Sequence, residues 1–201
     1  MSKLYKQINP QTWMRLWVYF CIALMTFLQL FFAESVYSRD VLFLQPWRLW
    51  TGHWVHLGIW HWILNVAALA LLPEIFLRAS WKYFLVLWVA LPPLLSLALW
   101  FCLPHLSMYA GLSGVLHGFY LAFAMAAICG HAGAERKIGW AVMIGLLAKV
   151  SWEAYRGMSQ TAELIGAPVI IQAHQYGAAL GFLIWSVVSM ISYLRHRAKF
   201  I

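Results

Sequence analysis

Residues 111–130 read GLSGVLHGFYLAFAMAAICG, an apolar run that carries a serine and a histidine within its first seven residues. A helix needs about 20 mostly apolar residues to cross the hydrocarbon layer of a membrane, and this run has that length. Polar side chains inside such a helix are costly, so each is by default a candidate functional residue. Ser113 and His117 are the first two candidates.

The rest of the chain has the same apolar character. Of its 201 residues, 64% are hydrophobic and 10% are charged, whereas soluble domains are about half apolar and a quarter charged. We therefore predict one all-α transmembrane domain over residues 1–201, a bundle of six helices. The expected spans are 13–33, 59–77, 83–103, 112–130, 138–155 and 169–193.

Two parts of this bundle carry features of their own. The fifth span holds Lys149 and Glu153, whose i, i+4 spacing predicts a structural ion pair along one helix face. The connection 34–58 is rich in tryptophan, and we expect it to be partly buried or interfacial, because loose backbone cannot face lipid.

The distribution of positive charge predicts the orientation, since cytoplasmic loops collect Lys and Arg. Ten basic residues fall on one side and four on the other. The larger set is Lys3, Lys6, Arg15, Arg78, Lys82, Arg136, Lys137, Arg195, Arg197 and Lys199, and the smaller is Arg39, Arg48, Lys149 and Arg156. We expect a bacterial inner-membrane protein with both termini in the cytoplasm. The net charge of +8 is dispersed between apolar runs, which argues against a nucleic-acid partner.

Four polar residues lie near the outer ends of three spans: His61, Asn65, Ser113 and His174. The second, fourth and sixth spans all run from outside to inside, and a helix rises about 1.5 Å per residue. Three distant stretches of sequence should therefore deliver polar groups to one depth in the outer part of the bilayer.

Small residues accompany the serine and the second histidine. Gly114 and Gly118 follow Ser113, and Gly177 and Gly181 follow His174. Such small-xxx-small faces let two membrane helices approach closely. We expect the fourth and sixth spans to pack through them, with Ser113 and His174 within hydrogen-bond reach.

A serine beside a histidine can act as an activated nucleophile. Ser113 follows Gly111 at the start of its helix, where backbone N–H groups could stabilise an oxyanion. His61 and Asn65 could donate to the same oxygen. The second, fourth and sixth spans offer no carboxylate at this depth, which predicts a Ser–His dyad. His117, one turn below Ser113, is the rival base.

These residues resemble the rhomboid family of intramembrane serine proteases. Gly111, Leu112, Ser113 and Gly114 are similar to its GxSG nucleophile motif, and His174 followed by Gly177 and Gly181 is similar to its catalytic histidine segment. His56, His61 and Asn65 resemble the signature of the second span, and Trp47 with Arg48 resembles the WR pair of the first outer loop. The resemblance implies a six-helix core, proteolysis of membrane-anchored substrates, and no metal or cofactor.

The resemblance implies further roles. His61, Asn65 and the Ser113 N–H would form the oxyanion hole, His53 and His56 would help to line an outward-opening cavity, and Arg48 would either support the outer loop or anchor it at the interface. The wording around Ser113 is also similar to the rhombosortase branch, which is thought to process surface proteins with a C-terminal Gly-Gly anchor.

Two other functions stay open from the sequence. One is an inactive rhomboid-like protein that binds membrane clients, although Ser113 and His174 are both present. The other is a metal or proton transporter that uses His53, His56 and His61, although no carboxylate or thiolate ligand is near them.

Overall fold

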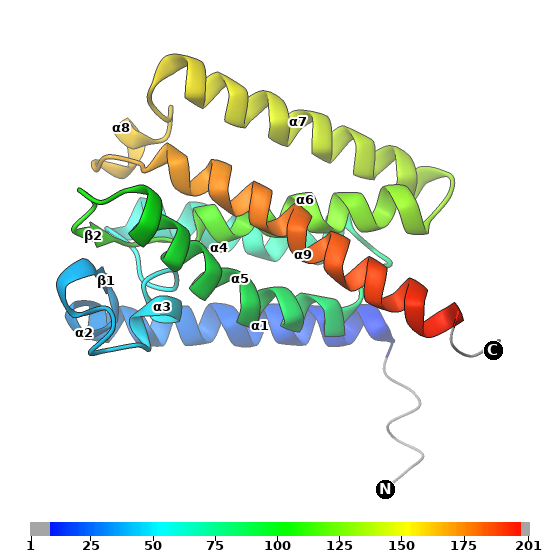
Figure 1. Cartoon of the computed structure of the whole chain (residues 1–201), viewed down its shortest axis with the longest axis horizontal. Coiled ribbons are helices and arrows are strands. Elements are labelled where there is room, and N and C mark those ends of the chain that lie inside the picture. The colour runs from blue at the N-terminus through cyan, green and yellow to red at the C-terminus, as the bar shows by residue number, and fades with distance from the viewer. Residues whose placement is uncertain (1–8, 198–201) are drawn as a thin grey trace, which may run out of the picture.

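The computed structural model describes residues 9–197, and its long helices run side by side along one direction (Figure 1). Each predicted span overlaps one of these helices, and four of the helices begin or end outside the predicted bounds. They are α1 (Pro10–Leu28), α4 (Ile59–Ile75), α5 (Trp81–Cys102), α6 (Ser113–Gly130), α7 (Ala134–Arg156) and α9 (Ile171–Arg197).

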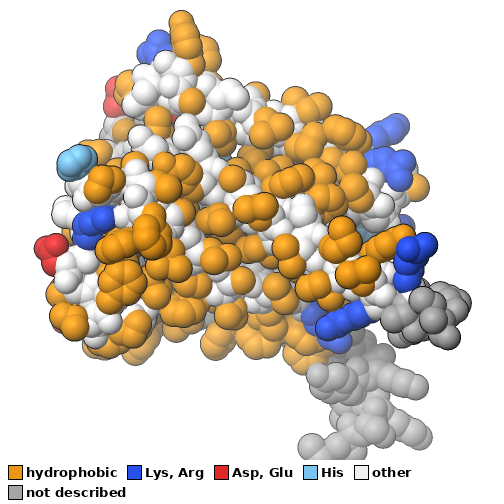
Figure 2. Space-filling model, in the orientation of Figure 1, with side chains coloured by type: hydrophobic (Ala, Val, Ile, Leu, Met, Phe, Trp, Pro, Cys, Tyr) orange, Lys and Arg blue, Asp and Glu red, His pale blue; other side chains and the backbone are white. Residues whose placement is uncertain are grey.

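Four helical segments of the described chain are long and apolar enough to cross a membrane: Pro10–Ser35, Trp81–Cys102, Ser113–Gly130 and Ile171–Arg195. Helix α4 is apolar but has only 17 residues. The protein is therefore a multi-pass membrane protein, and six crossings remain a prediction. Hydrophobic side chains cover the middle of the face in Figure 2, while most of the visible Lys and Arg gather at the end where α6 meets α7.

The basic residues used to predict orientation divide between the two ends of the bundle. Arg15, Arg78 and Arg136 belong to the end that holds the α4–α5 and α6–α7 connections, where Arg15 pairs with Glu74 at 2.7 Å. Lys3, Lys6 and Lys199 lie outside the described residues.

Helix α6 is the most buried of the four candidate spans of the described chain, and the first half of α9 packs closely against it. A Cβ on Gly177 would lie 2.7 Å from the carbonyl carbon of Gly114, and one on Gly181 would lie 2.6 Å from the Cα of Gly118. No side chain larger than hydrogen fits at these contacts. The glycine steps therefore let the two backbones touch, which fixes the depth of α9 relative to α6.

The end of the bundle that is predicted to face outward, called the outer end below, is built from short elements. They are η2 (Gln29–Phe31), α2 (Phe32–Ser35), β1 (Tyr37–Ser38), η3 (Arg39–Val41), α3 (Arg48–Thr51), β2 (Met108–Tyr109) and α8 (Ala162–Ile165). Tyr37 pairs with Tyr109 and Ser38 with Met108 in an antiparallel two-stranded sheet. The connection after α1 is thus joined to the loop that enters α6.

Further hydrogen bonds strengthen this junction. The Gly111 N–H donates to the Gly52 carbonyl at 3.2 Å, and Arg39 donates to the carbonyls of Trp100 and Leu103 at 2.6 and 3.1 Å. Those carbonyls lie at the end of α5, where helix geometry leaves them without partners. The connection between α1 and α4, residues 34–58, is called the outer connection below. It therefore holds the residues just before Ser113 in place.

Arg48 is buried within the outer connection rather than directed toward lipid. Its guanidinium donates to the carbonyls of Ala33 and Val36 at 2.9 and 2.5 Å and to the Gln45 side chain at 2.6 Å. A buried cation requires such partners. These contacts match the support role and not the interfacial anchor.

Candidate active site

Ser113 is the first residue of α6, at the outer end of the bundle. The preceding residue, Leu112, makes no side-chain hydrogen bond to the start of the helix. Gly111 has a φ of 122°, a conformation that side chains rarely adopt, and a Cβ there would lie 2.5 Å from His61 Nε2. The turn before Ser113 therefore needs glycine both for its backbone and to admit His61.

His174 lies in the first turn of α9, with only 2% of its surface exposed. Its Nε2 is 2.9 Å from Ser113 Oγ. The two residues are 61 positions apart, and the glycine contacts between α6 and α9 bring them together. A hydroxyl in hydrogen-bond contact with an imidazole is the arrangement that an activated serine requires.

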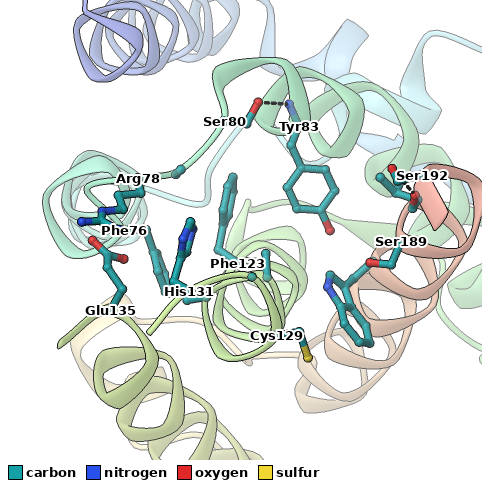
Figure 3. A pocket seen from close by; sticks show the side chains of 16 residues that line it. Phe76, Arg78, Ser80, Tyr83, Phe123, Cys129, His131, Glu135, Ser189 and Ser192 are labelled. Atoms are coloured by element: carbon teal, nitrogen blue, oxygen red, sulfur yellow. Dashed lines mark hydrogen bonds between the residues drawn. The ribbon is translucent and has the colours of Figure 1, made fainter. Parts of the chain in front are cut away.

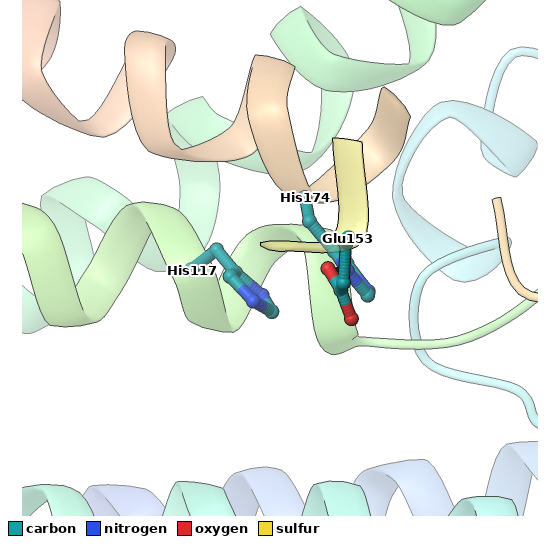
Figure 4. Close-up of side chains that lie close together, drawn as sticks. All are labelled: His117, Glu153 and His174. Carbon is teal, nitrogen blue, oxygen red and sulfur yellow. Dashed lines mark hydrogen bonds and ion pairs between the residues drawn. The ribbon is translucent and has the colours of Figure 1, made fainter. Parts of the chain in front are cut away.

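A carboxylate from α7 lies on the other side of His174, whereas the sequence predicted a Ser–His dyad. Glu153 Oε2 is 2.7 Å from His174 Nδ1. Glu153 comes from the outer end of α7, a helix that runs in the opposite direction to α4, α6 and α9. Figure 4 shows Glu153, His174 and His117 converging from α7, α9 and α6.

Lys149 and Ser159 bond the second oxygen of this carboxylate. Glu153 Oε1 accepts from Lys149 Nζ at 2.7 Å and from Ser159 Oγ at 2.8 Å. The predicted i, i+4 pair of Lys149 and Glu153 is therefore present. Its interpretation as a purely structural pair was incomplete, because Oε2 of the same carboxylate contacts His174.

His117 packs flat against His174 and does not contact the serine hydroxyl. The two ring centroids are 4.1 Å apart with an angle of 11° between the planes. His117 Nδ1 is 2.7 Å from the Ser113 carbonyl oxygen, and its Nε2 is 3.1 Å from Lys149 Nζ. A carbonyl only accepts and an ammonium only donates, so Nδ1 carries the proton and the Nε2 lone pair is occupied. This geometry disfavours His117 as the base.

His61 and Asn65 lie on the face of α4 that is turned toward Ser113. His61 Nδ1 accepts from the Leu57 N–H at 3.3 Å, which places the ring proton on Nε2, where it can be donated. Asn65 donates one amide N–H to the His61 carbonyl at 2.8 Å, and an amide nitrogen carries a second N–H. Both residues line a cavity that also contains Ser113 and His174.

Two cavities meet at the serine. One, of about 200 Å³, lies between the loop before α6 and the segment before α9 and is lined by Leu57, Met108 and Pro168 among others. The other, of about 310 Å³, lies between α4 and α7 and is mainly apolar, with Leu64, Leu71 and Leu146 in its wall. Ser113, His61, Ile165 and Val169 line both cavities. A peptide and a water molecule could thus reach the hydroxyl from different directions.

His53 and His56 do not line either cavity, contrary to the expectation from sequence. His53 is fully buried, with Nε2 2.9 Å from Ser96 Oγ. The His56 ring packs edge-on against His61, with centroids 5.1 Å apart. Both side chains belong to the interior of the outer connection, where they support α4 and α5 and do not face solvent.

The ligand atoms of His117, Glu153 and His174 lie within 4.8 Å of one another, close enough to hold a metal ion. Lys149 already contacts two of these three residues through its ammonium group. A second cation at this point would meet the charge of Lys149, so the group does not fit a metal site.

A larger cavity, of about 520 Å³, lies at the opposite end of the bundle (Figure 3). Arg78, Tyr83, His131, Glu135 and Ser189 are among its lining residues. Among the described residues that line this cavity, no serine forms a hydrogen bond with a histidine. Its size therefore does not make it the reactive site.

The fold and the site together define the class of this molecule. It is a multi-pass helical membrane protein that carries a hydroxyl–imidazole–carboxylate chain at one end of its bundle. The comparison with family models matches residues 44–191 to the rhomboid domain, and the chain belongs to the rhomboid family. Members of this family are generally intramembrane serine proteases. The comparison with curated proteins finds no match.

Proposed function

We propose that this protein is an intramembrane serine endopeptidase in which Ser113 is the nucleophile and His174 is its general base. The observation that carries the proposal is the 2.9 Å contact between Ser113 Oγ and His174 Nε2 at a point where two cavities meet. An inactive client-binding protein would not need this contact.

The reaction follows from the positions of the atoms. His174 Nε2 accepts the Ser113 proton as Oγ attacks a peptide carbonyl, and it returns that proton to the leaving amine. Water then attacks the acyl-enzyme with His174 as base again. Because rates depend on the fixed orientation of these groups, the α6–α9 contact contributes directly to catalysis.

The negative charge on the carbonyl oxygen requires donors that are already oriented. The Ser113 N–H, at the positive end of α6, and the side chains of His61 and Asn65 would supply them. Loss of one such donor typically slows an acyl transfer by about 10²- to 10³-fold.

The substrate would be a membrane-anchored protein cut near the outer face of the bilayer. A transmembrane helix must unwind before its backbone can be attacked, and glycine eases that step. Membership of the rhombosortase branch, with a C-terminal Gly-Gly anchor as substrate, is the finer proposal. In the predicted orientation the protein lies in a bacterial inner membrane, its termini are cytoplasmic and the site opens to the periplasm.

The first prediction concerns the nucleophile. A fluorescent fluorophosphonate should label the purified wild-type protein in detergent micelles and should not label Ser113→Ala, because only an activated serine attacks the probe at an appreciable rate. Wild-type protein that folds but takes up no label would contradict the proposal and favour the inactive alternative. Co-expression with a Gly-Gly anchored protein then tests the branch.

A further inference from the structure

We propose that Glu153 is a positioning residue that completes a Ser113–His174–Glu153 triad, with the carboxylate delivered by α7. The inference rests on the proposed serine protease function and extends it. It assigns a third residue to the reaction and gives Lys149 and Ser159 a defined purpose.

The hydrogen bonds of the His174 ring indicate which of its two nitrogens carries the proton. A neutral imidazole carries its proton on one nitrogen only, and the base must present a lone pair at Nε2. Glu153 Oε2, an acceptor 2.7 Å from Nδ1, holds the proton there. The lone pair of Nε2 then faces Ser113 Oγ, as proton transfer requires.

The two carboxylate oxygens of Glu153 have different hydrogen-bond partners. Oε1 accepts from Lys149 and Ser159, which satisfy the charge of Glu153, while Oε2 contacts His174. A purely structural i, i+4 pair lies on a helix surface, where it contributes little to stability. Glu153 is instead 3% exposed, and burying a carboxylate is expensive unless several donors surround it. The placement serves His174 rather than the ion pair.

During the attack on the substrate, positive charge develops on the His174 ring. The proton moves from Ser113 Oγ to His174 Nε2, which makes His174 positive, while Glu153 keeps its negative charge and takes no proton. The carboxylate stabilises this imidazolium at short range. Lys149 is directed to the other oxygen and to His117, so its charge does not displace that contact.

The experiment uses the full chain in detergent micelles and the fluorophosphonate as probe. Concentration series give kinact, which reports the chemistry, and KI, which reports binding. The variants are Glu153→Gln and Glu153→Asp. The control is Glu163→Gln, which removes an exposed carboxylate from the nearby α8.

We expect Glu153→Gln to lower kinact by about 10³-fold or more with KI within about threefold, because an amide can donate to Nδ1 and favour the wrong tautomer. Glu153→Asp keeps an acceptor and should recover at least about tenfold over Glu153→Gln. Glu163→Gln should match the wild type.

Three results would overturn the assignment. Unchanged kinact in Glu153→Gln shows that His174 needs no carboxylate. An equal loss in the Asp and Gln variants, together with a lowered unfolding temperature, shows a structural role. If the wild type itself takes up no label, the serine protease proposal is wrong and so is the triad. If the wild type is labelled and Glu153→Gln is labelled at the same rate, only the triad is wrong.

Discussion

At the scale of single residues, the partner of each imidazole decides what that histidine can do. His174 has a carboxylate on Nδ1 and a hydroxyl on Nε2, which suits a base. His117 has a carbonyl on one nitrogen and an ammonium on the other, so it has no lone pair to offer. His61 accepts through Nδ1 and is left with a donor at Nε2. Three histidines within one site thus differ in chemistry because their hydrogen bonds differ.

The second prediction separates the two stacked rings. His117→Phe keeps a flat ring against His174 and removes both of its hydrogen bonds, so kinact for the fluorophosphonate should fall by less than about tenfold. His174→Ala removes the proposed base and should cost about 10⁴-fold or more, the size of loss seen when serine proteases lose their histidine base. The opposite order, with His117→Phe inactive and His174→Ala active, would reverse the assignment of the base.

At the scale of secondary-structure elements, the site depends on how closely α6 and α9 approach. The glycines make this contact, and Tyr120 of α6 donates its hydroxyl to the Ala68 carbonyl of α4 at 2.8 Å. Helix α7 packs on α6 through Gly139, whose Cβ would lie 2.8 Å from the Ala124 carbonyl oxygen. Each helix that carries a site residue is therefore bound to α6 by a specific contact.

The third prediction tests the α6–α9 contact. Gly177→Ala places a methyl group 2.7 Å from the Gly114 carbonyl carbon, so the helices must separate. Overpacking of this kind typically costs about 1–3 kcal/mol, and His174 would also withdraw from Ser113. We expect a lower unfolding midpoint in an SDS titration and a lower kinact.

The control for this variant is Gly145→Ala in α7. Apart from its chain neighbours and the backbone of its own helix, no described heavy atom lies within 4 Å of the position where its Cβ would be. The free energy of unfolding should therefore stay the same or rise by up to about 1 kcal/mol. If the two variants behave alike, the close contact does not determine the stability of the bundle.

The arrangement of the helices also explains how much of the fold and of the site the sequence predicts. Apolar runs predict the helices, and the glycine steps beside Ser113 and His174 indicate which of them touch. The predicted site does not include Glu153, because the depth criterion applies to the second, fourth and sixth spans, which run from outside to inside. A span that runs outward also ends at the outer depth, and Glu153 lies in the last turn of such a span, so alternating direction was the signal available. Its contact with His174 depends on the rotation of α7, which the sequence pattern does not give.

At the scale of the whole molecule, the outer connection works as a packed cap on one end of the bundle. Its buried side chains include Tyr37, Leu42, Val55 and the two histidines His53 and His56. The sequence predicted partial burial here but placed both histidines in a cavity. It could not show that both rings are buried. The His53 ring packs against Tyr109 of a two-stranded sheet that joins segments about 70 residues apart, and a sequence pattern does not reveal such a pairing.

Burial of these two histidines makes the stability of the molecule depend on pH. Removal from water disfavours the charged ring, and this lowers the pKa of His53 and that of His56 from the ordinary 6.5 to about 3. Between those values the unfolded chain binds more protons than the folded chain. Stability is therefore complete above pH 6.5 and falls as the pH drops from 6.5 toward 3.

The fourth prediction is the size of that loss. At pH 5 each buried histidine should cost about 2 kcal/mol relative to pH 7.5, since one unit of pKa difference corresponds to about 1.4 kcal/mol. The unfolding midpoint in detergent at the two pH values measures it. His56→Leu should remove about 2 kcal/mol of the pH effect, because one titrating ring is lost. Neither ring nitrogen of His56 has a hydrogen-bond partner among the described residues, so the substitution breaks no hydrogen bond of the ring. His105→Gln, at an exposed loop position, should change nothing. A midpoint equal at both pH values would mean that protons reach these rings in the folded protein, and that the cap opens far more readily than its packing indicates.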